Sequence, residues 1–389
     1  MASIEKTLCS KAWTDLNIDF AKRQLRHCCK SIFEKFPDEL TFDFFNHSTD
    51  IIARRNDLLN GIEHPHCNHC WLSYKNTGTA YRDFANTWTS IKDKSNNITF
   101  IEIMLDNICD MSCIYCDADF SSKIASELKL KQQLQQPLER DLQVFIDWLV
   151  FVIPRQTKHV TLSFLGGEIT YSKNFFIFVE RLLAAKELHD TNITFSCLTN
   201  GNSSIDKVQK MLSMLDSLPE KWSVNISMSS EGMGEAGELV RWGLSWDRFK
   251  FNFEKYIQHD RISFLCLSPT PCLFTIPSML EYFEWAFETV RKYNKKVAIA
   301  GNWIVNPTEI DVARCSEDKK KYVIKTSELC KANKDLFVFE SEFEKTIKWL
   351  EKLEQRIATM PLDEGLLNKF LDQKAQQKDN RVYLLRNYL

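Results

Sequence analysis

The sequence predicts an α/β protein built on a parallel sheet. Apolar runs that favour strands recur six times between residues 98 and 305. A segment long enough to form a helix separates each run from the next. Six β/α units in series imply parallel strands joined by right-handed crossovers. An open twisted sheet and a curled partial barrel both fit this pattern.

The six predicted strands follow one another along the chain as residues 98–105, 159–165, 193–198, 224–228, 262–267 and 297–305. The first crossover contains two segments of mixed polar and apolar residues, 123–134 and 138–151, which are typical of helices. Beyond residue 315 the chain is rich in lysine, with helical patterns in residues 342–358 and 366–377.

These patterns divide the chain into three parts. Residues 1–95 contain two groups of cysteines and several aromatic residues, and their apolar residues show little periodicity. This pattern predicts a small module that is held together by something other than a hydrophobic core. Residues 96–315 hold the six β/α units. Residues 316–389 are expected to form a helical extension that either caps the β/α units or is exposed to solvent.

Composition limits the functional classes. Fifty Lys and Arg residues balance 52 Asp and Glu residues, giving a net charge of -2 and no overall field that would recruit a nucleic acid. No apolar run approaches the roughly 20 residues that a membrane span needs, and the first residues lack the apolar stretch of a signal peptide. We therefore expect a soluble, cytoplasmic protein without membrane contact, whose 13 cysteines bind metal instead of forming disulfides.

A loop of three cysteines follows the first predicted strand. Cys109, Cys113 and Cys116 have the spacing C-x3-C-x2-C, so three thiolates can face one iron–sulfur cluster. Such clusters usually have four cysteine ligands, and three would leave one iron open to a small molecule. Ordinary buried thiols, or half of a zinc site, are the alternatives. Active sites of β/α barrels lie at the carboxyl ends of the strands, where this loop is placed.

This loop, with Tyr115 before its last cysteine, resembles the signature of the radical S-adenosylmethionine (radical SAM) superfamily. The resemblance spans roughly residues 98 to 305 and implies a partial (β/α)6 barrel. It also implies a [4Fe-4S] cluster whose open iron binds S-adenosylmethionine. An electron from the cluster would then cleave S-adenosylmethionine to a 5′-deoxyadenosyl radical, and this radical would take a hydrogen atom from the substrate. An external one-electron donor such as flavodoxin or ferredoxin would then be a partner.

The same resemblance assigns further residues to the cofactor. Gly166, Gly167 and Glu168 resemble the family's GGE motif, in which the backbone and the carboxylate meet the amino group of the cofactor. Glycine would also let the backbone approach a ligand closely. Four more candidates, for the ribose, the carboxylate and the adenine, are Asn200, Ser229, Arg241 and Tyr115. Helix capping by Asn200 and Ser229, and a surface position for Arg241, are the alternatives.

The cysteines before residue 98 suffice for a second, four-coordinate site. Its candidate ligands are Cys9, either Cys28 or Cys29, Cys67 and Cys70. Zinc and iron–sulfur both fit, because His27, His64, His66 and His69 are also near. The order of these cysteines, with an Arg54-Arg55 pair and Arg82 and Asn86 between and after them, resembles the auxiliary-cluster module of SPASM and twitch-domain radical SAM proteins, here placed before the barrel. That resemblance favours an auxiliary [4Fe-4S] cluster over zinc.

The substrate is the least defined part of the prediction. The resemblance favours a peptide or protein, followed by a nucleotide or small metabolite. The rival from another class is a noncatalytic zinc or iron–sulfur sensor that binds a macromolecule; the Gly166-Gly167-Glu168 turn speaks against it, since a sensor has no need of this turn beside its cluster. Two further cysteines within predicted strands, Cys197 and Cys266, are expected to be small buried hydrophobic residues.

Overall fold

The computed structural model describes residues 7–78, 80–88, 98–130, 134–156, 159–304 and 306–389. Its centre is one nine-stranded sheet in the order β3-β2-β1-β4-β5-β6-β7-β8-β9. The strands are β1 (Asp15–Asp19), β2 (Gln24–Arg26), β3 (Glu34–Lys35), β4 (Phe100–Met104), β5 (Val160–Leu165), β6 (Ile193–Thr199), β7 (Ser223–Met228), β8 (Ile262–Leu267) and β9 (Val297–Ile299).

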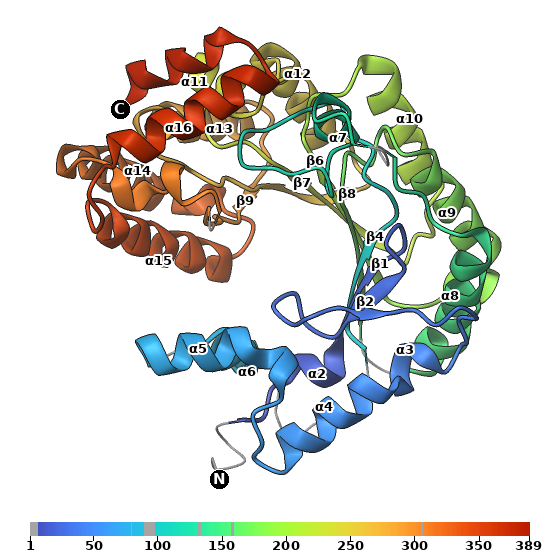
Figure 1. Cartoon of the computed structure of the whole chain (residues 1–389). Helices are drawn as coiled ribbons and strands as arrows, with labels where there is room; N and C mark the ends of the chain where they lie inside the picture. The colour runs from blue at the N-terminus through green and yellow to red at the C-terminus, as the bar shows by residue number, and fades with distance from the viewer. Residues whose placement is uncertain (1–6, 79, 89–97, 131–133, 157–158, 305) are drawn as a thin grey trace.

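Strands β1 and β4 to β9 are parallel, and β4 to β9 follow the chain order. Figure 1 shows the sheet strongly curved, with the crossover helices around its convex side. The sheet ends at β3 and β9, which are not paired with each other, so the molecule is a partial barrel. The crossover helices include α8 (Glu139–Val152), α9 (Lys173–Ala184), α10 (Ile205–Asp216), α12 (Trp246–Ile257) and α13 (Met279–Lys292).

Buried and half-buried side chains alternate along β5, and this alternation distinguishes the two faces of the sheet. Leu162 and Phe164 of β5 are at most 1% exposed, and Phe164 packs edge-on against Phe175 and Phe178 of α9. These residues lie on the convex face, with the helices. Their neighbours in the strand, Thr161 and Ser163, therefore lie on the concave face, because successive side chains of a strand point to opposite sides.

Five of the six predicted strands are confirmed to within two residues at each end. The sixth is wrong in length, because β9 ends at Ile299 and not at residue 305, and Val305 lies outside the described residues. The chain leaves the sheet at Gly301, where the indole of Trp349 fills the space that a Cβ atom would need. The first helix predicted in residues 123–134 is likewise shorter, since α7 (Ser122–Glu127) is followed by Lys129 with a φ of 54°; residues 131–133 are not described.

Residues before the first barrel strand contribute to the same sheet. β1 pairs in parallel with β4, and β2 and β3 extend the sheet as antiparallel strands. Residues of α2, α4 and α5, with Leu8, form a separate small core of Leu8, Ala12, Trp13, Leu58 and Trp71, against which Cys9 and Cys67 pack, whereas Phe45 and Ile51 belong to the main core. The helices of this part are α2 (Lys11–Thr14), α3 (Phe44–His47), α4 (Thr49–Leu59), η1 (Pro65–Cys67), α5 (Asn68–Thr77) and α6 (Tyr81–Trp88). A boundary at residue 95 stays a prediction.

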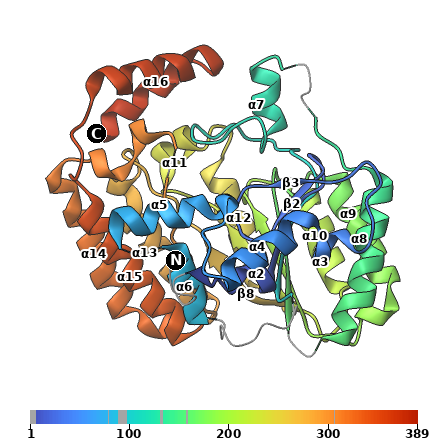
Figure 2. The same cartoon turned by 60° about the horizontal axis from the view of Figure 1, so that its bottom comes forward.

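The C-terminal part packs on the barrel as helices α14 (Lys320–Ala332), α15 (Glu340–Arg356) and α16 (Glu364–Gln377) and the 3-10 helix η9 (Asn380–Tyr388). Leu350 of α15 and Leu371 of α16 are fully buried in the main core. Figure 2 shows α16 at the same end of the barrel as α7. Among the described residues no helix has the length and apolarity to cross a membrane. The remaining short helices are α11 (Gly234–Val240), η2 (Ile153–Arg155), η3 (Lys186–Leu188), η4 (Ile276–Ser278), η5 (Thr308–Ile310), η6 (Val312–Arg314), η7 (Glu317–Lys319) and η8 (Lys334–Leu336).

Candidate active site

The three-cysteine loop lies directly beyond the carboxyl end of β4, as the sequence predicts. Backbone hydrogen bonds fix it against the end of α11 and the residues that follow: Ser112 N donates to Trp242 O at 2.9 Å and Ile114 N to Val240 O, the last residue of α11, at 2.9 Å. Ser121 Oγ donates to the Met111 carbonyl at 2.7 Å from the other side. The loop is therefore held on both sides, with Cys113 buried and Cys109 and Cys116 half-buried.

The thiols of this loop lie close enough to influence one another. Burial raises the pKa of all three, and for Cys109 and Cys116 the next largest cause is the negative charge of Cys113. The pKa of Cys116 reaches about 12. None of the three is in a disulfide. Neutral thiols buried together on one loop need a cation to lose their protons, because thiolates and not thiols bind metal.

The spacing of the thiols separates two kinds of metal site. Thiolates that share one zinc ion lie about 3.8 Å apart, because Zn–S bonds of about 2.3 Å meet at tetrahedral angles. In a [4Fe-4S] cluster each thiolate binds a different iron, so the sulfur atoms lie farther apart. Among the described residues, no three cysteines have their sulfur atoms all within 4.8 Å of one another. The loop therefore fits a cluster better than a single ion.

The Gly-Gly-Glu turn after β5 docks on the base of the cysteine loop. Gly166 and Gly167 have φ values of 87° and 54°, which glycine adopts without strain. A Cβ atom on Gly166 would lie 2.2 Å from the Met104 side chain, and one on Gly167 would lie 2.3 Å from the Ile108 carbonyl. The sequence suggests that these glycines let the backbone approach a ligand closely. In the structure, atoms of the protein itself lie where a Cβ atom of either residue would be. Glu168 N completes the contact by donating to Ile108 O at 2.6 Å.

Glu168 joins the carboxyl ends of two strands. Its side chain is fully buried and accepts hydrogen bonds from the Thr170 backbone and hydroxyl, from Thr199 Oγ1 at 2.8 Å and from Asn200 N at 2.6 Å. Burial raises the pKa of this carboxyl, while these donors act in the opposite direction. The contact of Glu168 with a cofactor stays a prediction.

Asn200 reaches across to the cysteine loop through Asp110. Its Nδ2 donates to Asp110 Oδ1 at 2.8 Å, and Asn202 Nδ2 donates to Asp110 Oδ2 at 3.2 Å. Asp110 lies between Cys109 and Cys113, so the end of β6 is tied to the loop that carries the thiols. Sequence reasoning missed Asp110 and Asn202; two asparagines around Gly201, directly after a strand, are the signal that would have suggested them.

Arg241 is buried and pairs with a carboxylate of the chain itself. Its Nη1 donates to both carboxylate oxygens of Glu231, at 3.0 and 3.2 Å, and to the Tyr115 hydroxyl at 2.8 Å. The sequence predicts Arg241 as a partner for a carboxylate but does not identify Glu231. The Nε atom of Arg241 is buried without a partner among the described residues. Ser229 is half-buried at the end of β7, where its N–H donates to the Thr199 carbonyl at 3.0 Å.

A second group of thiols lines one cavity in the N-terminal part. Cys9, Cys28, Cys67 and Cys70 face it together with two arginines, Arg54 and Arg82, and with His27. Cys29 is not among the residues that line this cavity. The sequence leaves Cys28 and Cys29 open, and the geometry favours Cys28.

Polar contacts position the thiols of this cavity. Asn86 accepts from Ser10 N at 2.8 Å and donates to Leu8 O at 2.9 Å, so it holds the chain on both sides of Cys9. Burial raises the pKa of Cys9 to about 12 and that of Cys67 to about 11, and Arg54 lowers the latter in part. Arg54 Nε and Arg82 Nη1 are buried, and neither has a hydrogen-bond partner within the part of the chain that the structure describes. Two unpaired guanidinium N–H groups beside four thiols suit an anionic group such as a thiolate-bound cluster.

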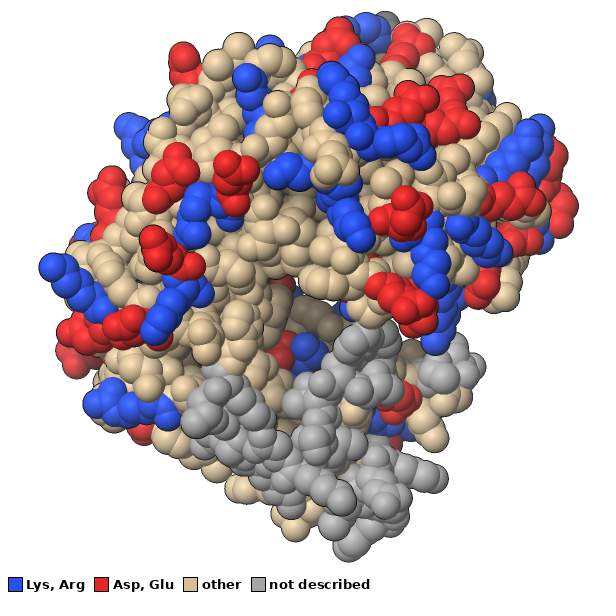
Figure 3. Space-filling view, turned by 180° about the vertical axis from the view of Figure 1, so that it is seen from behind, with Lys and Arg blue, Asp and Glu red and all other residues tan. Residues whose placement is uncertain are grey.

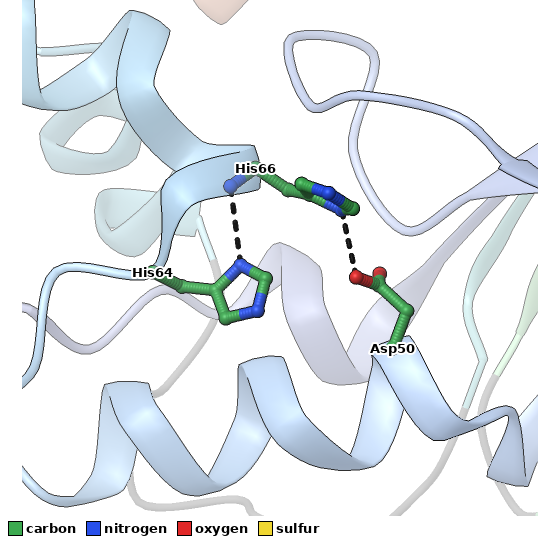
Figure 4. A group of neighbouring side chains, drawn as sticks. All are labelled: Asp50, His64 and His66. Carbon is green, nitrogen blue, oxygen red and sulfur yellow. Dashed lines mark hydrogen bonds and ion pairs between the residues drawn. The ribbon is translucent and has the colours of Figure 1, made fainter.

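The histidines are arranged differently from the thiols. Figure 4 shows His66 pointing at Asp50, with Nδ1 2.7 Å from Oδ1, and His64 Nδ1 accepting from His66 N at 3.2 Å. Their ligand atoms, with that of Asp50, lie within 4.8 Å of one another. Arg54 Nη2 also contacts Asp50, at 2.5 Å, so a metal ion there would face a guanidinium. His64 and His66 do not line the thiol cavity, and His69 is exposed.

The other two cysteines assigned to strands behave as expected. Cys197 in β6 is 1% exposed and Cys266 in β8 is 6% exposed, which confirms both as buried residues of the sheet.

Comparison with known proteins gives a likeness of fold alone. No protein-family model and no curated protein matches the sequence. Among solved structures, native anSMEcpe with bound AdoMet and a Cp18Cys peptide is 13% identical with a TM-score of 0.41, covering 60% of each chain. SuiB of Streptococcus suis bound to S-adenosylmethionine is 12% identical with a TM-score of 0.34, covering 61% of this chain and 44% of that one. TYW1 with a lysine–pyruvate adduct is 12% identical with a TM-score of 0.33, covering 61% and 71%.

This chain thus matches less than two thirds of the length of anSMEcpe or SuiB. At these TM-scores the likeness is partial, and the chemistry of the protein must be inferred from its own residues.

Proposed function

We propose that this protein is a radical SAM enzyme. The observation that carries the proposal is the position of Cys109, Cys113 and Cys116 on one fixed loop at the carboxyl edge of a partial barrel, with the Gly166-Gly167-Glu168 turn docked beneath it. When bound there, a site-open [4Fe-4S] cluster supplies the electron that cleaves S-adenosylmethionine and so generates the radical that takes a hydrogen atom from the substrate.

Residues of the chain hold the cysteine loop in place and offer hydrogen-bond donors to the cofactor. Three thiols give the ligands, and the bonds from Asn200 and Asn202 to Asp110 keep the loop from moving relative to β6. Glu168 fixes the ends of β5 and β6 next to it. Arg241 offers its unpaired Nε as a donor for a carboxylate, and Tyr115 is held beside it. Preorganised donors of this kind bind a charged cofactor without rearranging.

The cavity of Cys9, Cys28, Cys67 and Cys70 supports a second, auxiliary [4Fe-4S] cluster as part of the proposal. Zinc is disfavoured, because three sulfurs on one ion would lie within 4.8 Å of one another and no such set occurs among the described cysteines. The unpaired N–H groups of Arg54 and Arg82 would offset the negative charge of four thiolates. For the substrate we propose a peptide or protein, and for the electron source a flavodoxin or ferredoxin.

The test is cleavage of the cofactor by protein reconstituted anaerobically with iron and sulfide. With S-adenosylmethionine and dithionite, we expect 5′-deoxyadenosine by chromatography and a change in the electron paramagnetic resonance (EPR) spectrum of the reduced cluster when the cofactor binds. Cys113→Ala should abolish both while retaining the iron of the N-terminal site. Cys330→Ala, at a buried position of α14, is the matched control and should form 5′-deoxyadenosine and change its EPR spectrum as wild type does.

Two results would contradict the proposal. One is cofactor cleavage that persists in Cys113→Ala, which would remove the loop from the chemistry. The other is a protein with its full complement of iron that neither forms 5′-deoxyadenosine nor changes its EPR spectrum with the cofactor.

A further inference from the structure

Two arginines, Arg54 and Arg82, line the thiol cavity of the N-terminal part. The side chain of each is 3% exposed, so both positive charges lie inside the protein. Arg54 Nε and Arg82 Nη1 are buried and have no hydrogen-bond partner among the residues that the structure describes. A buried guanidinium with a free N–H group on the wall of a cavity suits an anion within that cavity.

Further contacts fix the positions of these two charges. Arg54 Nη1 donates to Ser31 Oγ at 2.9 Å, and its Nη2 donates to Asp50 Oδ2 at 2.5 Å. The guanidinium of Arg82 lies 4.6 Å from the centre of the Trp71 ring, and Trp71 lines the same cavity. Neither arginine can turn away from the thiols without losing buried contacts.

The two charges are only partly compensated by carboxylates. Asp50 pairs with Arg54, but Asp83, at 3.3 Å from Arg82 Nε, is 45% exposed, so solvent weakens its effect. Burial raises the pKa of Cys67 to about 11, whereas Arg54 and Arg82 both lower it. The positive charges of the arginines therefore act on the thiols of the cavity.

The charges beside the cysteine loop after β4 are more nearly balanced. Three cations there lie close to carboxylates: Arg241 pairs with Glu231 at 3.0 Å, Lys378 pairs with Glu127 at 3.4 Å, and Lys123 Nζ donates to the carbonyl of Asp110 at 3.0 Å. At Cys116 the charge of Lys374 is opposed by that of Asp117. The surroundings of the loop are therefore less positive than those of the thiol cavity.

Neither burial nor surface charge separates the two groups of thiols. Cys70 and Cys113 are buried, and the other thiols of both groups are half-buried. Figure 3 shows acidic and basic side chains interspersed on the face seen from behind, and exposed charges are screened by salt within about 10 Å. The reduction potential of an iron–sulfur cluster depends on charge, hydrogen bonds to sulfur and exposure. Of these, the buried arginines distinguish the thiol cavity.

We propose that Arg54 and Arg82 raise the reduction potential of the N-terminal cluster, so that it takes up an electron before the cluster on the cysteine loop does. This inference rests on the proposed function, in which both clusters are present. Each cluster takes one electron from the external donor, which is oxidised, and no bond is formed or broken. A buried positive charge favours the reduced cluster, because it attracts the added electron where little water screens it.

The experiment is a reductive titration followed by EPR. The reconstituted full chain is poised anaerobically at a series of potentials with dithionite and mediator dyes, and each reduced cluster is quantified. Cys113→Ala, which should retain the N-terminal cluster alone, identifies that signal, and S-adenosylmethionine identifies the signal of the catalytic cluster. The variants are Arg54→Met, Arg82→Met, the charge-retaining Arg54→Lys, and Asp50→Asn. Lys75→Met, at an exposed position of α5 that does not line the cavity, is the control.

In wild type we expect the N-terminal signal to appear at a higher potential than the catalytic signal. Where the wild-type N-terminal cluster is half reduced, Arg54→Met and Arg82→Met should each lower the ratio of reduced to oxidised cluster about tenfold, or about 59 mV for one electron. Arg54→Lys and Lys75→Met should stay close to wild type. Asp50→Asn removes an opposing carboxylate and should raise the ratio. General loosening of the structure would not shift the ratio in opposite directions.

Two results overturn this inference alone. One is a wild-type N-terminal signal that appears at or below the potential of the catalytic signal. The other is a potential in Arg54→Met and Arg82→Met that equals that of Lys75→Met, at wild-type iron content. If a Met variant loses its iron, Asp50→Asn decides, and a fall or no change in its ratio overturns the inference.

A different result separates this inference from the proposed function. Cys113→Ala without any iron–sulfur signal would overturn both the inference and the auxiliary cluster. Formation of 5′-deoxyadenosine by wild type in the same preparation would still support the catalytic cluster.

Discussion

At the scale of single residues, burial and neighbours distinguish side chains that are equivalent in the sequence. Cys28 and Cys29 are adjacent, yet only Cys28 lines the cavity shared with Cys9, Cys67 and Cys70. Two successive residues outside a regular helix point in different directions, and the fold selects the one that faces the other thiols.

This difference predicts distinct iron contents for two alanine variants. Cys28→Ala should lose about four irons per chain, the content of one cluster, whereas Cys29→Ala should keep the wild-type amount. Iron and acid-labile sulfide are measured after anaerobic reconstitution. Loss of iron in Cys29→Ala with retention in Cys28→Ala would reverse the assignment.

Glu102 predicts a specific dependence of stability on pH. Its native pKa of about 7 lies above the ordinary value of 4.5, so the folded chain holds this proton more tightly than the unfolded chain. Stability contributed by the protonated group is full below about pH 4.5 and is lost as the pH rises to about 7. Between pH 5 and pH 8 the loss should be about 2 kcal/mol.

Glu102→Gln removes this titration. The free energy of unfolding of the variant, relative to wild type, should therefore rise by about 2 kcal/mol from pH 5 to pH 8. Urea unfolding followed by circular dichroism at four pH values measures it, with Glu288→Gln, at an exposed position of α13, as the control. Parallel pH profiles for wild type and Glu102→Gln would show that the carboxyl group has an ordinary pKa.

At the scale of elements, the C-terminal helix α16 reaches the cysteine loop. Lys378, directly after α16, is 1% exposed in its side chain, and its Nζ donates to Ser112 Oγ at 2.9 Å. Ser112 in turn donates to Glu127 of α7 at 2.9 Å, and Lys378 forms an ion pair with the same glutamate at 3.4 Å. A residue 266 positions away thus holds the loop between Cys109 and Cys113.

Lys378→Met, which keeps the length of the side chain but removes its charge, should weaken this attachment. Glu127 would remain half-buried without its cation, and the free energy of unfolding should fall by about 2 kcal/mol. If the three-cysteine loop holds a cluster as proposed, we also expect that loop to lose iron faster in the presence of a chelator. Lys369→Met, an exposed position of the same helix, should change stability by less than about 0.5 kcal/mol. Equal chelator rates for the two variants would contradict a role for α16 in holding the loop.

At the scale of the whole molecule, the N-terminal part belongs to the barrel sheet. β1 pairs with β4 along five residues, and Phe20 after β1 packs 5.3 Å from Phe145 of α8. Phe45 lies 5.3 Å from Trp148 of the same helix. Removing these residues would expose both the edge of β4 and a large apolar surface.

A chain shortened to residues 96–389 should therefore not fold into a stable barrel. We expect it to aggregate or to lack a cooperative thermal transition, whereas the full chain shows one. Circular dichroism during heating and size exclusion measure this. A shortened chain that is monomeric and melts cooperatively would establish residues 96–389 as an independent domain.

Particular positions show which features of the fold can be predicted from the sequence. Five strands, the three-cysteine loop after β4 and the helices α15 and α16 follow from local patterns, because apolar periodicity and cysteine spacing are properties of neighbours in the chain. The end of β9 does not follow from local patterns, because the indole of Trp349, distant in the sequence, lies against Gly301. The length of α7 does not follow either, because Lys129 adopts a left-handed conformation just after the helix. Glu231 and Asp110 were missed for the same reason: their partners are distant or on another loop.

By itself the sequence determined the α/β class and the six β/α units, and it singled out the thiols that we propose as metal ligands, because each depends on residue type and spacing. The tertiary structure decided that β1 joins the barrel, that Cys28 and not Cys29 faces the other cysteines, and that Arg54 and Arg82 line the same cavity. Contacts between distant parts of the chain cause all three. The sheet and the wall of the cavity are assembled from segments that lie far apart in the sequence, and only the folded chain brings those segments together.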